Sequence, residues 1–425
     1  MVLKIFSTLR NNWKKTAFGG VVLAFGTNYV LNQMECNKLM TAHCQRALQY
    51  GDQPIGATTP LRRIIVILNP AADKRNAKKY FEKYCAPILH LSGALVDIKV
   101  TKGEGDARKL VESLKERVDA IVIAGGDGTI SEVVTGLLRG FDHDCSLARR
   151  IPIGILPLGK NNHIAQSIYG PIDDSKVDRV QALARASMTV VQQAKSSEMN
   201  ALCVQVLKEG ESTEESAKFY ALHSIDWGNL KYAQSKRDKY WYLGPLKPYA
   251  TYVFNGFSLP PVKAEIAYSN PCSGCKRCYT KRSDVKVEPK KQWFQLFAPK
   301  STGDVKPKNY ALIENDQCGV LNQQQVTSMD VKVTALPPPH MTFVKGKDSY
   351  DYQDFVKSGW DFEQFNRIEA KEQIHAQQLD IIPKFHEEDP GKDKHNFVYI
   401  DNEQFDLKPL RITLLQNTIQ VYNPV

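Results

Sequence analysis

The first half of the chain alternates short apolar runs with segments of helical periodicity. Apolar residues rich in Ile, Val and Leu fill residues 64–70 (IIVILNP), 94–101, 119–124 and 151–158. Continuous apolar runs of this length are typical of strands buried on both faces of a parallel sheet. The pattern therefore predicts an open α/β domain, in which right-handed crossovers pack helices against the sheet.

The second half has a different pattern. Short β-type segments predict strands at residues 201–207, 218–228, 263–269, 309–314, 329–336 and 397–422. Residues 345–395 are charged, rich in Gln and poor in aliphatic residues, so we expect loops there with one or two strands. The predicted class is α/β plus β. Its parts are an N-terminal segment and linker (1–60), an α/β domain (61–195) and a β-rich domain (196–425).

The N-terminal segment is basic and contains an apolar stretch. Residues 1–34 hold four Lys or Arg and no acidic residue, as in mitochondrial targeting segments. The apolar stretch 16–31 is shorter than the roughly 20 residues that span a bilayer as a helix. Three interpretations stay open: a mitochondrial signal with a helix lying on the membrane, a secretory signal, or a helix packed on the fold.

Composition narrows the class of protein. The 425 residues are 42% hydrophobic and 24% charged, which excludes a wholly disordered chain. No run of 18 apolar residues occurs, which excludes a polytopic membrane protein. The net charge of +10 suits an anionic partner such as membrane lipid, a nucleotide or nucleic acid. No nucleic-acid recognition motif accompanies that charge, so we expect no nucleic-acid partner.

A glycine-rich turn follows the third predicted strand. Gly125, Gly126, Asp127, Gly128 and Thr129 occur in succession. Glycines let the backbone approach a ligand closely, and the N-terminus of the following helix attracts phosphate. Thr129 and the Glu three residues later predict a capping box at the start of this helix. Asp127 is a candidate Mg²⁺ ligand or proton acceptor.

A second turn follows the fourth predicted strand. Residues 154–160 match the G-x-x-x-x-G-K of a P-loop, but Asn161 stands where that loop needs Ser or Thr. The middle residues also continue an apolar strand, so we interpret the match as strand followed by turn. Gly159, Lys160 and Asn162 are then candidate contacts to phosphate or ribose. Since ligands of parallel sheets bind at the carboxyl ends of the strands, both turns should face one crevice.

These strings resemble a known family. The glycine turn at 125–129, Asn69-Pro70 after the first strand, and Pro157-Leu158-Gly159 followed by Asn162 are similar to the diacylglycerol kinase catalytic family. That family includes diacylglycerol, sphingosine and ceramide kinases. Residues 9–15, 69–72, 86–93 and 239–247 resemble its mitochondrial branch acting on acylglycerols. The resemblance extends to about residue 268, fades, and returns near the C-terminus.

The resemblance implies a function and a set of residues. It implies an ATP- and Mg²⁺-dependent lipid kinase that phosphorylates the hydroxyl of monoacylglycerol or diacylglycerol. A ceramide or sphingosine acceptor, or a non-catalytic role in protein import, are the alternatives. Location would be the inner mitochondrial membrane or intermembrane space, with the carrier translocase as a possible partner. The implied nucleotide site comprises Asn69, Gly125, Gly126, Asp127, Gly128, Thr129, Gly159, Lys160 and Asn162.

The resemblance also implies a general base. The family's late motif, an Asp followed two residues later by Glu, matches Asp401 and Glu403. A carboxylate that accepts the hydroxyl proton accelerates such a transfer by roughly 10²–10⁴-fold. We assign the base to Asp401 and the phosphate–Mg²⁺ region to Asp127, with the reverse assignment open. Where many relatives have Ser-Gly, this chain has Ala71-Ala72, so either Lys74 or Arg75 contacts the phosphate instead or the phosphate contact is weaker.

Three further segments have no fixed role. Cys272, Cys275 and Cys278 have zinc-like spacing, but the next cysteine, Cys318, is forty residues away, so zinc, a redox pair and an idle surface loop stay open. The basic insertion near 270–308 suits an anionic membrane or a solvated loop. The aromatic stretch 240–254 suits either a lipid channel or membrane contact, or ordinary core packing.

Overall fold

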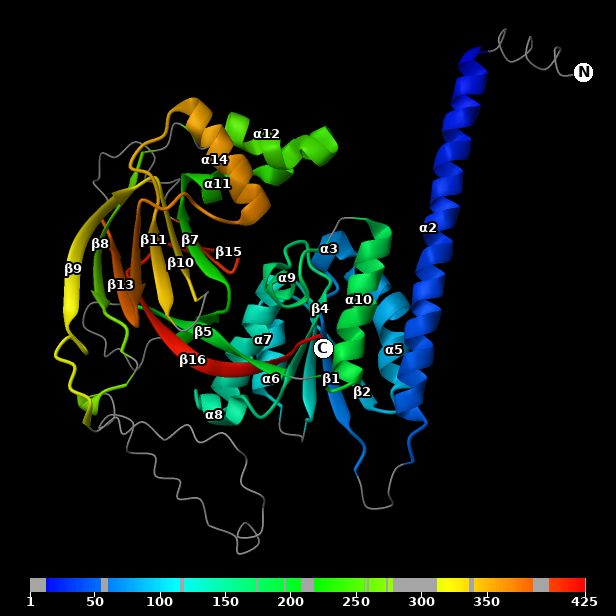
Figure 1. Ribbon diagram of the computed structural model, residues 1–425, viewed down its shortest axis with the longest axis horizontal. Coiled ribbons are helices and arrows are strands. Elements are labelled where there is room, and N and C mark those ends of the chain that lie inside the picture. The colour runs from blue at the N-terminus through cyan, green and yellow to red at the C-terminus, as the bar shows by residue number, and fades with distance from the viewer. Residues whose placement is uncertain are drawn as a thin grey trace, which may run out of the picture. The chain divides into compact units, whose positions relative to one another are not determined.

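The chain forms two compact units, which Figure 1 shows in the computed structural model. The structure describes residues 13–54, 60–114, 118–172, 175–194, 196–207, 218–255, 257, 260–272, 274–277, 312–335, 340–384 and 397–424. Unit 1 comprises residues 1–199 and 417–425, and unit 2 comprises residues 200–416.

Unit 1 contains the predicted parallel sheet. Its strands lie in the order β2 (Leu95–Val100), β1 (Arg63–Leu68), β3 (Ala120–Gly125) and β4 (Ile153–Pro157). The end of β16 (Leu410–Tyr422) continues the sheet, with Val421 opposite Ile153. Along the chain, β1 is followed by β2 on one side of the sheet, and β3 is followed by β4 on the opposite side. The carboxyl ends of the neighbouring strands β1 and β3 therefore form the topological switch point at which open α/β sheets bind ligands.

Short helices connect the strands of unit 1. They are α6 (Asp106–Glu112), α7 (Asp127–Gly140), α8 (Cys145–Ala148), α9 (His163–Tyr169) and α10 (Lys176–Val191). The stretch between β1 and β2 is broken into short helical segments. It consists of α3 (Ala72–Arg75), α4 (Ala77–Tyr80), a π-helical turn (Phe81–Cys85) and α5 (Ala86–Leu91). The break begins with three successive left-handed residues, Asp73, Lys74 and Arg75, which a regular helix cannot contain.

The N-terminal helix α2 (Trp13–Gly51) belongs to unit 1 (Figure 1). Its C-terminal half packs on α10 and α5 and buries Cys36 and Ala47. The three interpretations concern the apolar stretch 16–31, which lies before this half, and they stay open. The apolar residues nearer its start, among them Phe18, Leu23 and Phe25, are exposed. Within the described part of the chain, no helix is long and apolar enough to span a bilayer.

Unit 2 is built on two sheets. In one, β16, β13 (Gln378–Pro383), β8 (Val262–Ser269) and β9 (Leu321–Ser328) lie in that order, and β5 (Ser196–Val206) pairs with β6 (Lys218–Ala221). The other has the order β12 (Glu372–Ala376), β11 (Met341–Lys345), β10 (Asp330–Thr334), β7 (Ser224–Gly228), β14 (Phe397–Ile400) and β15 (Glu403–Asp406). Apolar side chains from both sheets form one core.

The expected strand at 218–228 was wrong in one respect. It is two strands, β6 and β7, which belong to different sheets. The expected strand at 309–314 was also wrong as far as it is described, because residues 312–314 form no strand and residues 309–311 lie outside the described residues.

A helical layer completes unit 2. It consists of α11 (Asn229–Ser235), a 3₁₀ segment η2 (Arg237–Leu246), α12 (Lys247–Phe254) and α14 (Tyr352–Phe365). The last of these contradicts the expectation of loops at 345–395. The side chains of the aromatic stretch differ in burial. Tyr240 and Tyr252 are buried, whereas Trp241, Tyr242 and Phe254 are exposed.

Candidate functional site

Two glycine turns interlock at the carboxyl edge of the unit 1 sheet. A Cβ atom on Gly159 would lie 2.2 Å from the Cα of Gly126, so both residues must be glycine for the turns to meet. The Asp127 N–H donates to the carbonyl of Asn161 at 3.1 Å. The Leu158 N–H donates to the carbonyl of Gly125, also at 3.1 Å. The turns after β3 and β4 are therefore one structural feature, beside the switch point.

Asn69 ties the end of β1 to the same place. Its side-chain Nδ2 donates to the Thr129 hydroxyl at 3.0 Å, and its side-chain Oδ1 accepts from the Ala71 N–H at 3.0 Å. The predicted capping box was wrong. Helix α7 begins at Asp127, its N-cap residue is Gly126, and no side chain caps it. Instead, Glu132 accepts a hydrogen bond from the Gly105 N–H at 2.8 Å.

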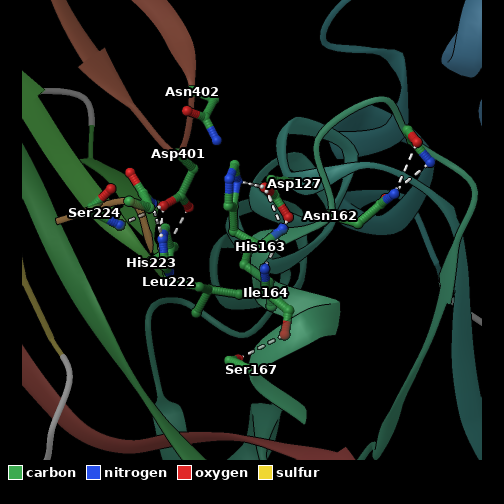
Figure 2. Close-up of polar contacts among 12 residues, drawn as sticks. Asp127, Asn162, His163, Ile164, Ser167, Leu222, His223, Ser224, Asp401 and Asn402 are labelled. Atoms are coloured by element: carbon green, nitrogen blue, oxygen red, sulfur yellow. Dashed lines mark hydrogen bonds and ion pairs between the residues drawn. The ribbon is translucent and has the colours of Figure 1, made fainter. Parts of the chain in front are cut away.

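Asp127 connects the glycine turn to helix α9 (Figure 2). Its carboxylate accepts hydrogen bonds from the His163 N–H at 3.0 Å and the Ile164 N–H at 3.1 Å. The His163 Nδ1 lies 3.1 Å from the same carboxylate. Burial alone would raise the pKa of Asp127, but these hydrogen bonds and the imidazole outweigh it, so the pKa is lowered. Asp127 is thus an ionised group that holds the start of α9.

The other residues that were predicted to contact the nucleotide either form the turns or are exposed cations. Asn162 closes its own turn, because its side chain accepts from the Gly159 N–H at 3.0 Å and donates to the Gly159 carbonyl at 2.9 Å. Gly128 lies in the first turn of α7. Lys160 is exposed beside Gly159, and Lys74 and Arg75 are exposed just after β1. Three cationic side chains are therefore exposed on the segments that follow β1 and β4.

Asp401 lies in unit 2, at the hairpin turn between β14 and β15 (Figure 2). Asp401 and Asn402 have positive φ angles of 47° and 69°, as the tight hairpin requires. The Asp401 carboxylate accepts from the backbone N–H groups of Leu222 and His223 at 2.8 Å, and from that of Ser224 at 3.1 Å. These three amides lie where the chain leaves β6 and enters β7. Asp401 therefore stabilises the point at which the chain passes from one sheet to the other.

A buried polar cluster lies beside this hairpin turn and was missed in the sequence. Lys231 donates to the side chain of Asn402, and Lys332 pairs with Asp226 at 2.8 Å. Burial lowers the pKa of Lys231 to about 8, against the opposing effect of Asp226. Burial would raise the pKa of Asp226, but the lysines lower it to about 2. Lys332 lies between two buried valines of β10, and this lysine in an apolar strand is the one sequence feature that could have indicated the cluster.

His163 was also missed. It follows the second turn directly, but no motif marks it, and its contact with Asp127 depends on a residue 36 positions earlier.

Both glycine turns lie in a part of the chain that is similar to a known protein family. Residues 63–196, which hold both glycine turns, match the diacylglycerol kinase catalytic domain. Over these residues the chain is similar to that family. The resemblance noted in the sequence is therefore confirmed.

Relatives extend the similarity beyond this domain. The chain is 38% identical over 272 residues to "Acylglycerol kinase, mitochondrial" of Xenopus laevis, covering 64% of this chain and 60% of the relative. It is 39% identical over 268 residues to the protein of the same name in Homo sapiens, covering 63% and 60%. The chain thus matches less than two thirds of the length of these relatives.

A solved structure supports the fold. The crystal structure of a diacylglycerol kinase from Bacillus anthracis is similar with a TM-score of 0.50 at 17% identity, covering 86% of this chain and 99% of that one. At this identity the likeness concerns the fold alone. The predicted class, α/β followed by a β-rich part, is confirmed.

Proposed function

We propose that this protein is a lipid kinase that transfers the γ-phosphoryl group of ATP to the hydroxyl of monoacylglycerol or diacylglycerol. The observation that carries the proposal is the pair of interlocked glycine turns inside the diacylglycerol kinase catalytic domain. The names of the relatives support acylglycerols as acceptors. The products would be lysophosphatidic and phosphatidic acid.

The turns suit the chemistry of phosphoryl transfer. Such a transfer depends on positioning and on neutralising charge more than on covalent catalysis. Gly126 and Gly159 leave the backbone bare of side chains, and the N-terminus of α7 follows at once. Lys160 and Lys74 add exposed positive charge at the same edge. We therefore place the ATP phosphates against these turns.

Mg²⁺ is best assigned to the substrate, as MgATP. Magnesium usually keeps several waters and binds substrate phosphates together with one or two carboxylates. Asp127 fits such a ligand poorly, because it is 2% exposed and its two oxygens accept N–H groups of α9. We propose that Asp127 positions the second turn through α9, and that neither metal binding nor proton transfer is its main role.

The role of Asp401 as general base stays a prediction from the family motif. Its three amide donors stabilise the negative charge and fix the orientation of the carboxylate. Within unit 2, Asn402 is fixed beside it by Lys231. Loss of activity on substitution must be separated from loss of the fold, because Asp401 also stabilises the β6–β7 break.

An exposed aromatic patch suits delivery of the lipid. We define the patch as Trp241, Tyr242, Leu246 and Phe254, which are all at least 63% exposed. Exposed Lys236 and Lys239 lie close in sequence to Trp241. Amphipathic aromatics and lysines together favour the interface of an anionic membrane. The names of the relatives support a mitochondrial location, and the inner membrane or intermembrane space is implied only by the family resemblance. A carrier translocase partner is implied only by the family resemblance.

The test is ³²P transfer from ATP to mixed micelles of monoacylglycerol, diacylglycerol, ceramide or sphingosine. Wild type is compared with Gly159→Ala, which separates the turns, and with Gly103→Ala, whose Cβ would meet nothing within 4 Å. We expect labelled lysophosphatidic or phosphatidic acid with wild type and Gly103→Ala, and a loss of at least tenfold with Gly159→Ala.

The acceptor panel distinguishes the alternatives. Preferential labelling of ceramide or sphingosine would replace the acylglycerol assignment while keeping the lipid kinase. A folded, vesicle-bound wild type that labels no lipid would contradict the kinase proposal. That result would favour the non-catalytic import role.

A further inference from the structure

Three cysteines meet at the base of the long connection between β8 and β9. These strands pair antiparallel, with Ser269 opposite Leu321 at the end of the ladder. Cys272 follows β8 by three residues, and Cys318 precedes β9 by three residues. The register of the hairpin therefore brings Cys318 back to the Cys272-x-x-Cys275 pair, although more than forty residues separate them in the sequence.

The three sulfur atoms form a compact group. The Sγ atoms of Cys272, Cys275 and Cys318 all lie within 4.8 Å of one another. Cys275 is 1% exposed, and the other two are half-buried. Cys278 lies outside the described residues.

Backbone and side-chain hydrogen bonds hold the two segments together. The Lys276 N–H donates to the Ile313 carbonyl at 2.9 Å. The Cys318 N–H donates to the Asn315 carbonyl at 3.2 Å. The side-chain amide of Asn315 donates to the Cys272 sulfur at 3.5 Å. The arrangement resembles the outer shell of a metal site, in which an amide hydrogen-bonds a ligand sulfur and fixes its direction.

We propose that Cys272, Cys275 and Cys318 bind a Zn²⁺ ion through three thiolates, with the fourth tetrahedral position taken by water or another ligand. Sulfurs that share a tetrahedral zinc at about 2.3 Å are about 3.8 Å apart, so small side-chain movements complete the site. A disulfide would use two of the three sulfurs and leave the third beside it. Ordinary packing requires neither the C-x-x-C spacing nor the amide directed at sulfur.

The charge and proton balance of the site is simple. Each thiol releases its proton to solvent as its sulfur bonds the metal. Three thiolates and Zn²⁺ leave a net charge of −1. Lys276 and Arg277 follow Cys275 directly, and Arg277 bonds the carbonyl of Asp316 at 3.1 Å, so positive charge lies next to that anion. No electron transfer is involved.

The site would clamp the long connection at its base. Closing a long loop costs conformational entropy that a metal bound only in the folded state can offset. The clamp would fix the ends of β8 and β9, and it does not depend on the proposed kinase activity.

The experiment uses the full chain, purified anaerobically without chelator, with Zn²⁺ and Co²⁺ as probes. Zinc content per chain is measured for wild type, Cys318→Ser, Cys318→His and Cys145→Ser, a control whose half-buried thiol lies in unit 1. We expect about one zinc per chain in wild type and Cys145→Ser, its loss in Cys318→Ser, and its return in Cys318→His, since histidine is also a zinc ligand.

Spectroscopy of the wild type tests the proposal even if a variant fails to fold. Replacing zinc by Co²⁺ should give the sulfur-to-cobalt charge-transfer band of thiolate coordination. The proposal would be overturned by the absence of this band, by unchanged zinc content in folded Cys318→Ser, or by a disulfide among the three cysteines in the anaerobic protein.

Discussion

At the residue scale, two motif carboxylates stabilise the backbone around them. Asp127 accepts N–H groups at the start of α9, and Asp401 accepts three at the β6–β7 break. Each is almost completely buried. A buried donor left without its acceptor costs about 1–3 kcal/mol. A motif residue in this protein can therefore be essential for the fold before it is essential for any reaction.

Asp401→Asn tests whether Asp401 stabilises the fold at the hairpin turn. The amide offers one carbonyl oxygen where the carboxylate offered two, so at least one buried N–H loses its partner. We expect unfolding to be easier by about 2–3 kcal/mol. Glu403→Gln, two residues away on β15 and partly exposed, should change stability by less than about 0.5 kcal/mol. Urea unfolding measures both, and equal stability of the two variants would contradict the structural role.

Asp330 gives a prediction about pH. It is buried in unit 2, where it accepts from the Leu230 N–H at 2.8 Å and the Tyr350 hydroxyl at 2.9 Å. Burial raises the pKa of Asp330 from 3.8 to about 8, although these hydrogen bonds oppose the shift. A raised folded pKa means that the stabilising contribution is complete below pH 3.8 and is lost as the pH rises through about 8.

Asp330→Asn should remove that pH dependence, because asparagine resembles the protonated acid. Relative to wild type, the variant should gain up to about 1.4 kcal/mol of stability per pH unit between about pH 4 and 8. Asp361→Asn, an exposed position on α14, serves as control and should leave the slope unchanged. Urea unfolding at several pH values gives the comparison, and parallel curves for Asp330→Asn and wild type would refute the assigned pKa.

At the element scale, the close contact between the two glycine turns is the feature most sensitive to change. The Cβ of Gly159→Ala would meet backbone atoms of Gly126, which cannot move aside like a flexible side chain. We expect a loss of about 1–3 kcal/mol in stability and weaker MgATP binding. Gly103→Ala should be neutral or stabilising by up to about 1 kcal/mol. Thermal unfolding and nucleotide titration test both, and normal MgATP affinity in Gly159→Ala would contradict the placement of the phosphates.

The parallel strands of unit 1 were predictable because each is a continuous apolar run. The turns after β3 and β4 were predictable from glycine at the end of such runs. The false capping box shows the limit of local reasoning: the Thr129 hydroxyl bonds Asn69, sixty residues away. Likewise, no residue pattern within 218–228 indicates that the chain passes from one sheet to the other. The backbone amides at this break donate to Asp401, which lies far away in the sequence.

Helix α14 was missed for a related reason. Only Phe355, Gly359 and Phe362 of this helix are buried, so its apolar face is narrow and the polar composition dominates the pattern. Its start is marked by Asp351, whose side chain accepts from the Asp354 N–H at 2.7 Å. A search for an N-cap followed by aromatics seven residues apart would have found it. The meeting of Cys318 with Cys272 could not be inferred, because it depends on the β8–β9 register.

At the scale of the whole molecule, each unit exposes its own apolar surface. In unit 1 it is the N-terminal half of α2, with Leu23 and Phe25 more than 70% exposed. In unit 2 it is the aromatic patch, with Trp241 77% exposed. Large exposed apolar patches are typical of surfaces that bind a membrane or a partner, so both surfaces are candidates for such contact. When two weak attachments act on one chain, the second becomes intramolecular and strengthens binding by roughly 10²–10⁴-fold.

Bivalent attachment predicts how vesicle binding responds to substitution. Leu23→Ser with Phe25→Ser, or Trp241→Ser with Tyr242→Ser, should each weaken binding to cardiolipin-containing vesicles by at least tenfold, and all four together should abolish it. Because these side chains are exposed, thermal unfolding should change little. Leu95→Ser with Val100→Ser, on exposed positions of β2, controls for loss of apolar surface elsewhere. Co-sedimentation measures the binding. If one pair removes all binding and the other none, a single surface holds the membrane and the bivalent interpretation fails.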